Sequence, residues 1–267
     1  MQLILGFLFG TLIALLAWRI NALSASGAFA AALSGGIIFG LGGLTWAVIL
    51  LTFFISSSML SRIHSKRKTS LNEKFAKGHQ RDWGQVLANG GLGILLVLIT
   101  TLYPEQKWTW IAYIGAMAAV NADTWATEFG VLNPGKPRLI TSGKPVEKGS
   151  SGGISLYGYL AAFGGAALIG LVAVLIQYEP SPLQVLFIII LGGLLGSTAD
   201  SILGATIQVI YSCPNCDKET ERHPLHTCGT GTVYYRGWRW LNNDWVNFIC
   251  SLVGGVSTLV LYTLLLK

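Results

Sequence analysis

Charged residues are scarce in this sequence. Asp, Glu, Lys and Arg make up 11% of its 267 residues, whereas 52% are hydrophobic. Soluble domains carry about 25% charged residues, so this scarcity excludes an ordinary soluble enzyme and predicts an integral membrane protein. The amino-terminal run also lacks a basic n-region and a small-residue cleavage site. We therefore expect a retained first helix and not a signal peptide.

Cysteine is also rare, with four residues in the chain, and this excludes a disulfide scaffold. Three of the four cluster in one polar stretch, CPNC…HPLHTC, and Cys250 stands alone in an apolar run. A C-x-x-C pair with a nearby His and Cys is a pattern of Cys₃His zinc knuckles. The candidate ligands of this knuckle, in a loop at 212–230, are Cys213, Cys216, His226 and Cys228. Reduced cysteines without a metal are the alternative, and any zinc here would be structural.

Long apolar runs dominate the rest of the chain. A membrane span needs about 20 mostly apolar residues. Candidate spans lie at 2–19, 27–41, 44–60, 85–103, 108–129, 153–177, 183–210 and 245–266. The second and third are short and are separated only by GLGGLT (40–45), so they are either two short helices or a re-entrant pair. The sequence predicts an all-α polytopic membrane protein with seven or eight transmembrane helices, built as a single domain over 1–267.

The polar loops predict the orientation of this domain. Three long loops, at 61–84, 130–152 and 211–244, are each separated by two spans and therefore lie on one side. That side holds all but Lys107 and Lys267 of the 18 lysines and arginines. By the positive-inside rule these are cytoplasmic loops of a bacterial plasma membrane or its equivalent. The net charge of +6 is then a signal of topology and not of nucleic-acid binding.

Two carboxylate-bearing segments interrupt the apolar runs. NADTWATEFG (121–130) ends the fifth span, and Asp200 lies within LLGSTADSILG (194–204). An intramembrane charge costs at least about 2.5–3.5 kcal/mol, so it normally faces a bundle interior or a wet cavity. Two carboxylates from different helices suit Mg²⁺, which takes oxygen ligands together with substrate phosphates. We expect Asp123, Asp200 and Glu128 to hold Mg²⁺, with Asn121 and Thr124 beside them to bind substrate. The alternatives are an interfacial cluster at a helix end and an aspartate that only packs against a neighbouring helix.

The loop after the fifth span predicts a phosphate site. ITSGKPVEKGSSGGIS (140–155) combines Lys144 and Lys148 with GSSGG (149–153) immediately before the next span. Exposed backbone N–H groups, point-charge lysines and a helix amino terminus together bind phosphate. We assign Ser150, Ser151 and Gly152 to this cradle. A plain basic interfacial loop is the alternative, and the sequence is not a Walker A motif.

Weaker candidates flank two other spans. Arg81 and Asn89 lie at the entry of the fourth span, where the positive-inside rule explains the basic charge equally well. Asn243 and Asn247 share one face at the start of the last span. Helix capping is the competing explanation for LNNDWVN.

Taken together, these segments resemble a known family. NADTWATEFG, ITSGKPVEKGSSGGIS, GSTADSILGATIQ and LNNDWVN are similar to the integral-membrane family that includes plant phytyl-phosphate kinase of the vitamin E (tocopherol) pathway. The pattern of Asp123, Ala126 and Gly130 followed by a Lys–Glu–Gly loop also resembles dolichol and phytol kinases and CDP-diacylglycerol synthases. The resemblance implies CTP- or other NTP-dependent phosphoryl transfer to a prenyl phosphate such as phytyl phosphate, giving the diphosphate.

The residues fit this function. Lys144, Lys148 and the GSSGG backbone would hold the nucleotide, and Arg81 and Asn89 would orient the isoprenoid phosphate. The acceptor phosphate is itself the nucleophile, so no histidine base is required. Two rival functions use the same groups. A CTP-dependent cytidylyltransferase would act on a lipid phosphate and release pyrophosphate, and an ion-coupled transporter or flippase would bind its coupling ion at Asp123 and Asp200.

Overall fold

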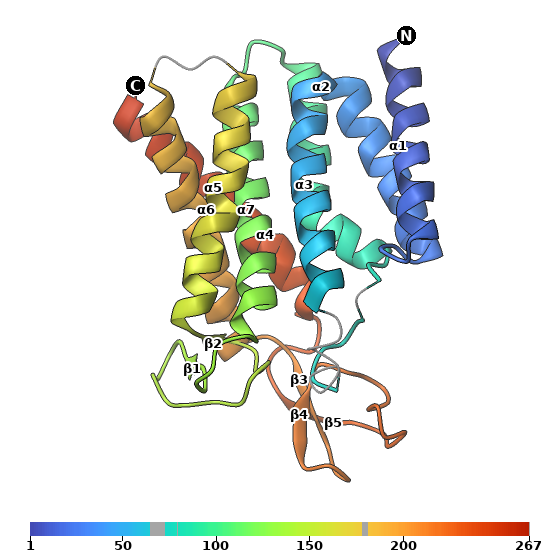
Figure 1. Ribbon diagram of the computed structural model, residues 1–267, viewed down its shortest axis with the longest axis vertical. Coiled ribbons are helices and arrows are strands. Elements are labelled where there is room, and N and C mark those ends of the chain that lie inside the picture. Colours follow the sequence, from blue (N-terminus) through green and yellow to red (C-terminus); the bar gives the residue numbers. More distant parts are fainter. Residues whose placement is uncertain (65–72, 79, 178–180, 267) are drawn as a thin grey trace.

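The computed structural model describes residues 1–64, 73–78, 80–177 and 181–266. Its helices stand side by side as a bundle, with short strands beyond one end (Figure 1). The helices are α1 (Gln2–Arg19), α2 (Ala25–His64), α3 (Trp83–Leu102), α4 (Trp108–Gly130), α5 (Leu156–Ile176), α6 (Pro182–Thr206) and α7 (Asn243–Leu266). The predicted all-α polytopic class is confirmed.

Helix α2 contains a break at Gly43, whose φ of 78° and ψ of −166° are not helical. The second leg runs alongside α4 in the same direction, since the Tyr113 hydroxyl donates to Trp46 O at 2.9 Å and Ser61 Oγ donates to Glu128 Oε1 at 2.6 Å. The first leg instead packs antiparallel to α1, because a Cβ on Gly6 would meet Gly40 and one on Gly10 would meet Gly36. The two legs therefore form a hairpin, which gives eight helical segments within the described residues. The predicted pair of short apolar segments at 27–41 and 44–60 corresponds to these two legs.

Helix α4 is the centre of the bundle. Residues 109–122 are all buried, and helices on every side pack against them. Among the described helices, all except α4 are long and apolar enough to cross a membrane by length and composition. A central helix is shielded from lipid, so it can carry the polar residues that end it.

Small residues bring α4, α6 and α7 into close contact. A Cβ on Gly196 of α6 would lie 2.5 Å from the Ala119 side chain of α4, and one on Gly254 of α7 would lie 2.3 Å from the same atom. Membrane helices associate through such close backbone approach, because lipid gives them no hydrophobic drive to pack. The glycine richness of the sequence is thus used at the α4–α6–α7 interface.

The strands form two small sheets at one end of the bundle (Figure 1). Antiparallel β1 (Arg138–Leu139) and β2 (Gly153–Ile154) frame the loop that contains GSSGG. The second sheet has the order β4-β3-β5, from β3 (Ile210–Cys213), β4 (Lys218–Thr220) and β5 (Val233–Arg236). The sequence did not indicate these strands, since two to four residues are too few to show an alternating pattern.

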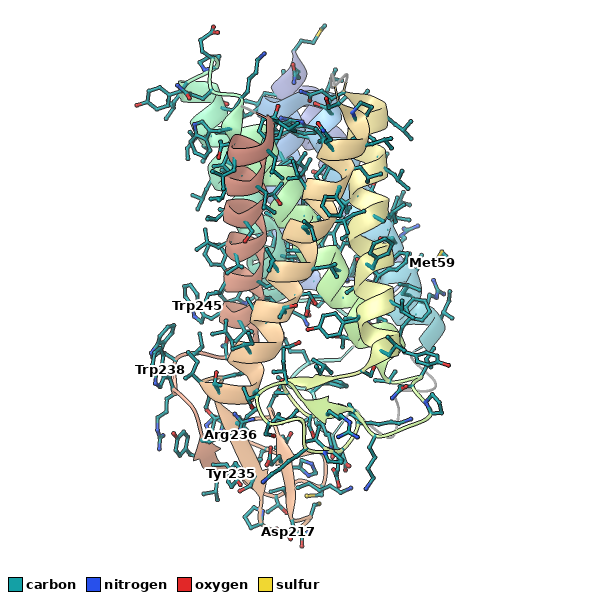
Figure 2. All side chains as sticks on the ribbon, turned by 90° about the vertical axis from the view of Figure 1, so that its left-hand side faces the viewer. Met59, Asp217, Tyr235, Arg236, Trp238 and Trp245 are labelled. Atoms are coloured by element: carbon teal, nitrogen blue, oxygen red, sulfur yellow. The ribbon has the colours of Figure 1, made fainter. Side chains whose placement is uncertain are left out.

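The described parts of the three long loops lie at the same end as the sheets, and both termini lie at the other end (Figure 1). This is the arrangement expected of an even number of crossings. Trp238 and Trp245 face outward where the bundle meets the strands, and both are about half exposed (Figure 2). Exposed tryptophans are typical of the boundary between membrane and water.

Candidate functional site

A cavity of about 640 Å³ opens at the end of the bundle that carries the loops. It is walled by the carboxyl-terminal parts of α4 and α6, by the first turns of α3, α5 and α7, and by residues 75–78, 148–155 and 208–223. Most of the site residues expected from sequence lie on this wall: Arg81, Asn89, Asp123, Thr124, Glu128, Lys148, Ser150, Ser151, Gly152, Asp200, Asn243 and Asn247. One cavity therefore collects segments that span most of the chain.

Asp123 of α4 and Asp200 of α6 face this cavity together. Ser197 Oγ donates to Asp123 Oδ1 at 3.4 Å, a long hydrogen bond. The Asp200 Oδ2 atom is buried and has no hydrogen-bond partner within the described part of the chain. A buried carboxylate oxygen without a donor is costly, and a bound cation would remove that cost. These two carboxylates therefore fit the oxygen-rich coordination that Mg²⁺ requires.

Three helix amino termini also border the cavity. The first turns of α3, α5 and α7 border the cavity through Gln85, Gly158 and Asn243. Side-chain caps from Asp82, Ser155 and Asn242 each satisfy one N–H group of these turns. The positive dipole end of each helix still favours an anion there. The carboxylates, in contrast, stand near the carboxyl ends of α4 and α6. The cavity thus brings carboxylates near helix carboxyl ends together with three helix amino termini.

The GSSGG segment is held tightly against α6. Gly152 has a φ of 79°, and a Cβ there would lie 2.5 Å from the backbone N of Ala205. Only glycine meets both conditions without strain. Ser155 then caps α5 by accepting from Gly158 N at 3.1 Å. Lys148 lies at the start of this segment, and its Nζ is 3.5 Å from Val131 O.

We expect Gly152→Ala to displace the segment, because the new Cβ would collide with α6 at a backbone conformation that alanine disfavours. The free energy of unfolding should fall by about 1–3 kcal/mol, measured by thermal unfolding in detergent. Gly135→Ala is the matched control, since its Cβ would meet only Asn133 Nδ2 at an ordinary 3.7 Å. Equal stability of the two variants would contradict the assigned role of Gly152.

Arg81 lines the cavity two residues before α3 begins. Its guanidinium lies 5.2 Å from the centre of the Phe53 ring, and it also senses the charge of Glu128. Burial lowers the pKa of Arg81 to about 10, an effect that Glu128 opposes. The side chain is still a cation at pH 7, and a bound anion would raise its pKa again. Arg81 is therefore placed to hold an anionic group at the membrane boundary.

Two expected site residues lie outside the cavity wall. Asn121 is buried two turns deeper than Glu128, where it accepts from Ser56 Oγ at 3.0 Å and donates to Gly165 O at 2.8 Å. It joins α4 to α2 and α5. Lys144 is exposed beside β1, and its carbonyl accepts from Leu139 N at 2.9 Å.

Several other wall residues make contacts between segments that are distant in the sequence. Lys77 bridges Asp82, at the start of α3, and Asp244, in the first turn of α7. These bonds outweigh burial and raise the pKa of Lys77. Tyr211 and His223 stack at 4.4 Å between ring centres. No sequence pattern marked these contacts, because they join segments far apart in the chain.

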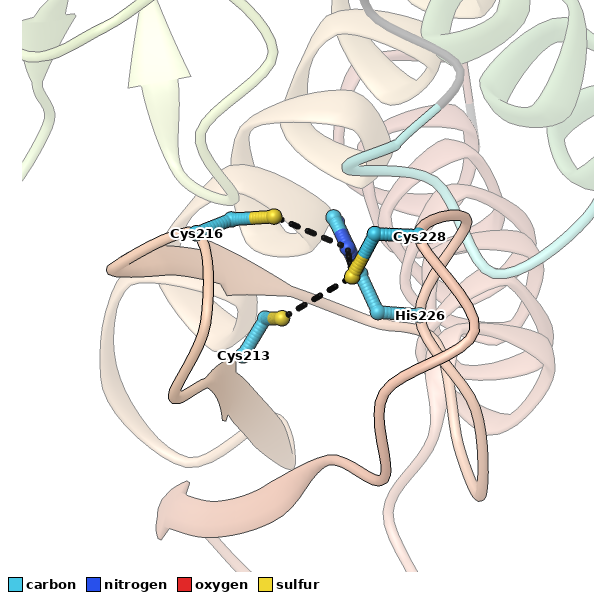
Figure 3. Close-up of side chains that lie close together, drawn as sticks. All are labelled: Cys213, Cys216, His226 and Cys228. Atoms are coloured by element: carbon cyan, nitrogen blue, oxygen red, sulfur yellow. Dashed lines mark hydrogen bonds between the residues drawn. The ribbon is translucent and has the colours of Figure 1, made fainter.

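The second sheet carries the cysteine cluster (Figure 3). Ligand atoms of Cys213, Cys216, His226 and Cys228 all lie within 4.8 Å of one another. The two Sγ atoms of Cys213 and Cys228 are 3.5 Å apart, and His226 Nδ1 is 3.2 Å from Cys228 Sγ. In tetrahedral zinc with Zn–S bonds near 2.3 Å, neighbouring sulfurs stand about 3.8 Å apart. The four side chains therefore fit a closed Cys₃His zinc site.

Comparison with known proteins gives the family. The model of the integral membrane protein family DUF92 matches residues 8–255. The chain belongs to this family. Protein PGR of Arabidopsis thaliana is 33% identical to it over 279 residues, covering 96% of this chain and 95% of PGR. An uncharacterized membrane protein of Methanocaldococcus jannaschii, MJ0933, is 30% identical, covering 98% and 94% of the two chains.

A more distant relative connects this DUF92 protein to the resemblance seen in its motifs. Protein VTE6, chloroplastic, from Arabidopsis thaliana is 22% identical over 254 residues, which cover 93% of this chain and 68% of VTE6. The expected family is thereby confirmed. No solved structure matches this chain.

Proposed function

We propose that this protein transfers a phosphoryl group from a nucleoside triphosphate to a prenyl phosphate at the cytoplasmic face of the membrane. The observation that carries the proposal is the composition of a single cavity. It unites two carboxylates from separate membrane helices with a glycine-serine loop, a lysine and three helix amino termini. This combination of groups suits a metal-bound polyphosphate.

The relationship to VTE6 supports the choice of acceptor. The family that the motifs resemble includes the plant phytyl-phosphate kinase, and VTE6 aligns with 93% of this chain. A prenyl phosphate has an apolar tail and an anionic head, so its head belongs where a membrane bundle meets a polar cavity. Arg81 and Asn89 border the cavity near the start of α3 and would bind that head.

The residues divide the work of phosphoryl transfer. Asp123 and Asp200 hold Mg²⁺, and Glu128 stands beside them on the next turn of α4. When bound, Mg²⁺ neutralises charge on the transferring phosphoryl group. Lys148 and backbone N–H groups of GSSGG hold the nucleotide phosphates, except the N–H groups of Ser150 and Gly153, which already donate to carbonyl groups of the chain. Thr124, Asn243 and Asn247 complete the polar wall around the substrates.

The reaction needs little covalent chemistry from the protein. An oxygen of the prenyl phosphate forms a bond to the γ-phosphorus, and the bond to the nucleoside diphosphate breaks. The acceptor oxygen is already ionised at pH 7, so no side chain has to remove a proton. What the cavity supplies is alignment of the two phosphates and fixed positive charge, which dominate catalysis of phosphoryl transfer.

Purified protein in lipid nanodiscs provides the test. It is incubated with prenyl phosphates of several chain lengths, Mg²⁺ and each nucleoside triphosphate in turn, and both products are analysed by mass spectrometry. We expect prenyl diphosphate and nucleoside diphosphate in equal amounts. Pyrophosphate with a cytidylylated lipid would instead establish a cytidylyltransferase. Ion-driven flux in proteoliposomes without nucleotide turnover would establish a transporter and overturn the proposal.

A further inference from the structure

Glu221 lies on the cavity wall directly after β4, and its carboxylate joins three separate segments. Oε1 accepts hydrogen bonds from Ser151 Oγ and from Gln208 Nε2, each at 2.8 Å. Oε2 accepts from the backbone N of Ala76 at 3.4 Å. One side chain of the small sheet thus contacts the GSSGG segment, the end of α6 and residues 73–78.

The backbone around Glu221 is fixed as well. Its N–H donates to Lys74 O at 2.8 Å, and the preceding Thr220 donates through Oγ1 to Glu73 O at 2.6 Å. Lys218 of the same strand forms an ion pair with Glu73 at 2.6 Å. These contacts hold β4 against residues 73–76 along its whole length. The Glu221 carboxylate is therefore presented to the cavity from a rigid support.

The donors to Glu221 are a hydroxyl, a side-chain amide and a backbone N–H, all of them neutral. Burial raises the pKa of Glu221, and the hydrogen bond from Ser151 is the largest of the effects that oppose the rise. In the described contacts, no cation pairs with this carboxylate. Burying a carboxylate without a cation costs free energy. An apolar residue would pack at lower cost, so the hydrogen bonds themselves need a purpose.

The bond to Ser151 indicates that purpose. Ser151 stands between Ser150 and Gly152 in the GSSGG segment, which borders the cavity. Because its hydroxyl donates to Glu221, its proton is not offered to a ligand. The bond instead fixes the direction in which the neighbouring peptide groups point. Gln208 ties the same carboxylate to α6, against which Gly152 packs.

We propose that Glu221 is a positioning residue that holds the GSSGG segment in the arrangement that binds nucleotide phosphates. The identity of the ligand in this inference rests on the proposed function. The hydrogen bonds of Glu221 are independent of it. It also assigns a task to the sheet with the cysteine cluster. That sheet forms part of the cavity wall in addition to holding the cysteine cluster.

Two readouts on the full-length protein test the role. The first is hydrogen–deuterium exchange of the peptide covering 149–153 in ligand-free protein, and the second is the split between nucleotide KM and kcat. For Glu221→Ala we expect faster exchange in that peptide and a nucleotide KM raised roughly 10- to 100-fold, as for loss of hydrogen bonds to a charged group. The kcat at saturation should fall much less.

Glu219→Ala is the matched control, because Glu219 is an exposed carboxylate on the same strand. It should leave both readouts at the wild-type value. Ser151→Ala should accelerate exchange of the same peptide. The double variant Glu221→Ala with Ser151→Ala should exchange little faster than Glu221→Ala alone. The hydrogen bond that Ser151→Ala removes is already absent from Glu221→Ala.

Unchanged exchange of 149–153 in Glu221→Ala would overturn the proposal. So would a fall in kcat with unchanged exchange, which would identify Glu221 as a third metal ligand. A wild-type protein without transfer activity would count against the proposed function alone. The exchange measurement would still decide whether Glu221 positions the segment.

Discussion

Asp200→Asn and Asp123→Asn should each reduce phosphoryl transfer by about 10²–10³-fold or more while leaving a folded membrane protein. Each variant keeps the shape of the side chain but removes the negative charge that Mg²⁺ needs. Steady-state transfer at saturating Mg²⁺ measures the loss. Size-exclusion chromatography and thermal unfolding in detergent measure the fold.

The stability readout separates a metal ligand from a packing residue. Asp200 Oδ2 has no donor in the described part of the chain, and Asp123 receives one hydrogen bond at 3.4 Å. Little hydrogen bonding is lost on amidation, and a buried charge is removed. The metal-free Asp200→Asn variant should therefore be at least as stable as metal-free wild type. An aspartate needed for packing would show the opposite sign, with lower stability and retained transfer.

Asp217→Asn is the control for the same chemical change. Asp217 is exposed at the tip of the second sheet, away from the membrane helices (Figure 2). Its φ of 50° suits asparagine as well as aspartate. This variant should keep full transfer. If it lost as much activity as Asp200→Asn, the loss of one negative charge at any position would explain the effect, and the metal assignment would fail.

The two aspartates could be predicted from sequence because the membrane makes them conspicuous. A carboxylate within an apolar run is expensive, so its presence at position 123 or 200 already indicates a wet cavity or a cation. The helical membrane bundle could be predicted for a related reason, since apolar length is directly visible in the sequence. GLGGLT was the weak point, and its Gly43 breaks α2 into the two legs of a hairpin.

Contacts between residues that are distant along the chain could not be predicted from the sequence. Ser151 and Glu221 are 70 residues apart, and Lys77 and Asp244 are 167 apart. No local pattern announces such pairs. Asn121 illustrates a different limit. It shares a face of α4 with Glu128 but lies two turns deeper, where α2 and α5 close over it. Helical periodicity predicts the face of a residue and not the depth at which a cavity ends.

The cysteine cluster yields the second large effect. Cys213→Ser should abolish tight metal binding and release the segment 210–236 from its fold, because three remaining ligands cannot close a tetrahedral site of this kind. Mass spectrometry should find one zinc per chain in the wild type and almost none in this variant. Limited proteolysis should cleave within 210–236 at rates at least about 10-fold above wild type, as a locally unfolded segment allows.

Cys250→Ala is the control for removing a thiol, since Cys250 is fully buried in α7 and lies outside the cluster. It should keep the zinc and the protease resistance. The Cys213→Ser bundle should also remain folded, because helices α1–α7 pack without the sheet. Nucleotide affinity should nevertheless fall, since Glu221 and its bonds to Ser151 and Gln208 depend on β4. Normal nucleotide affinity in a zinc-free, protease-sensitive variant would show that the sheet and the cavity act independently.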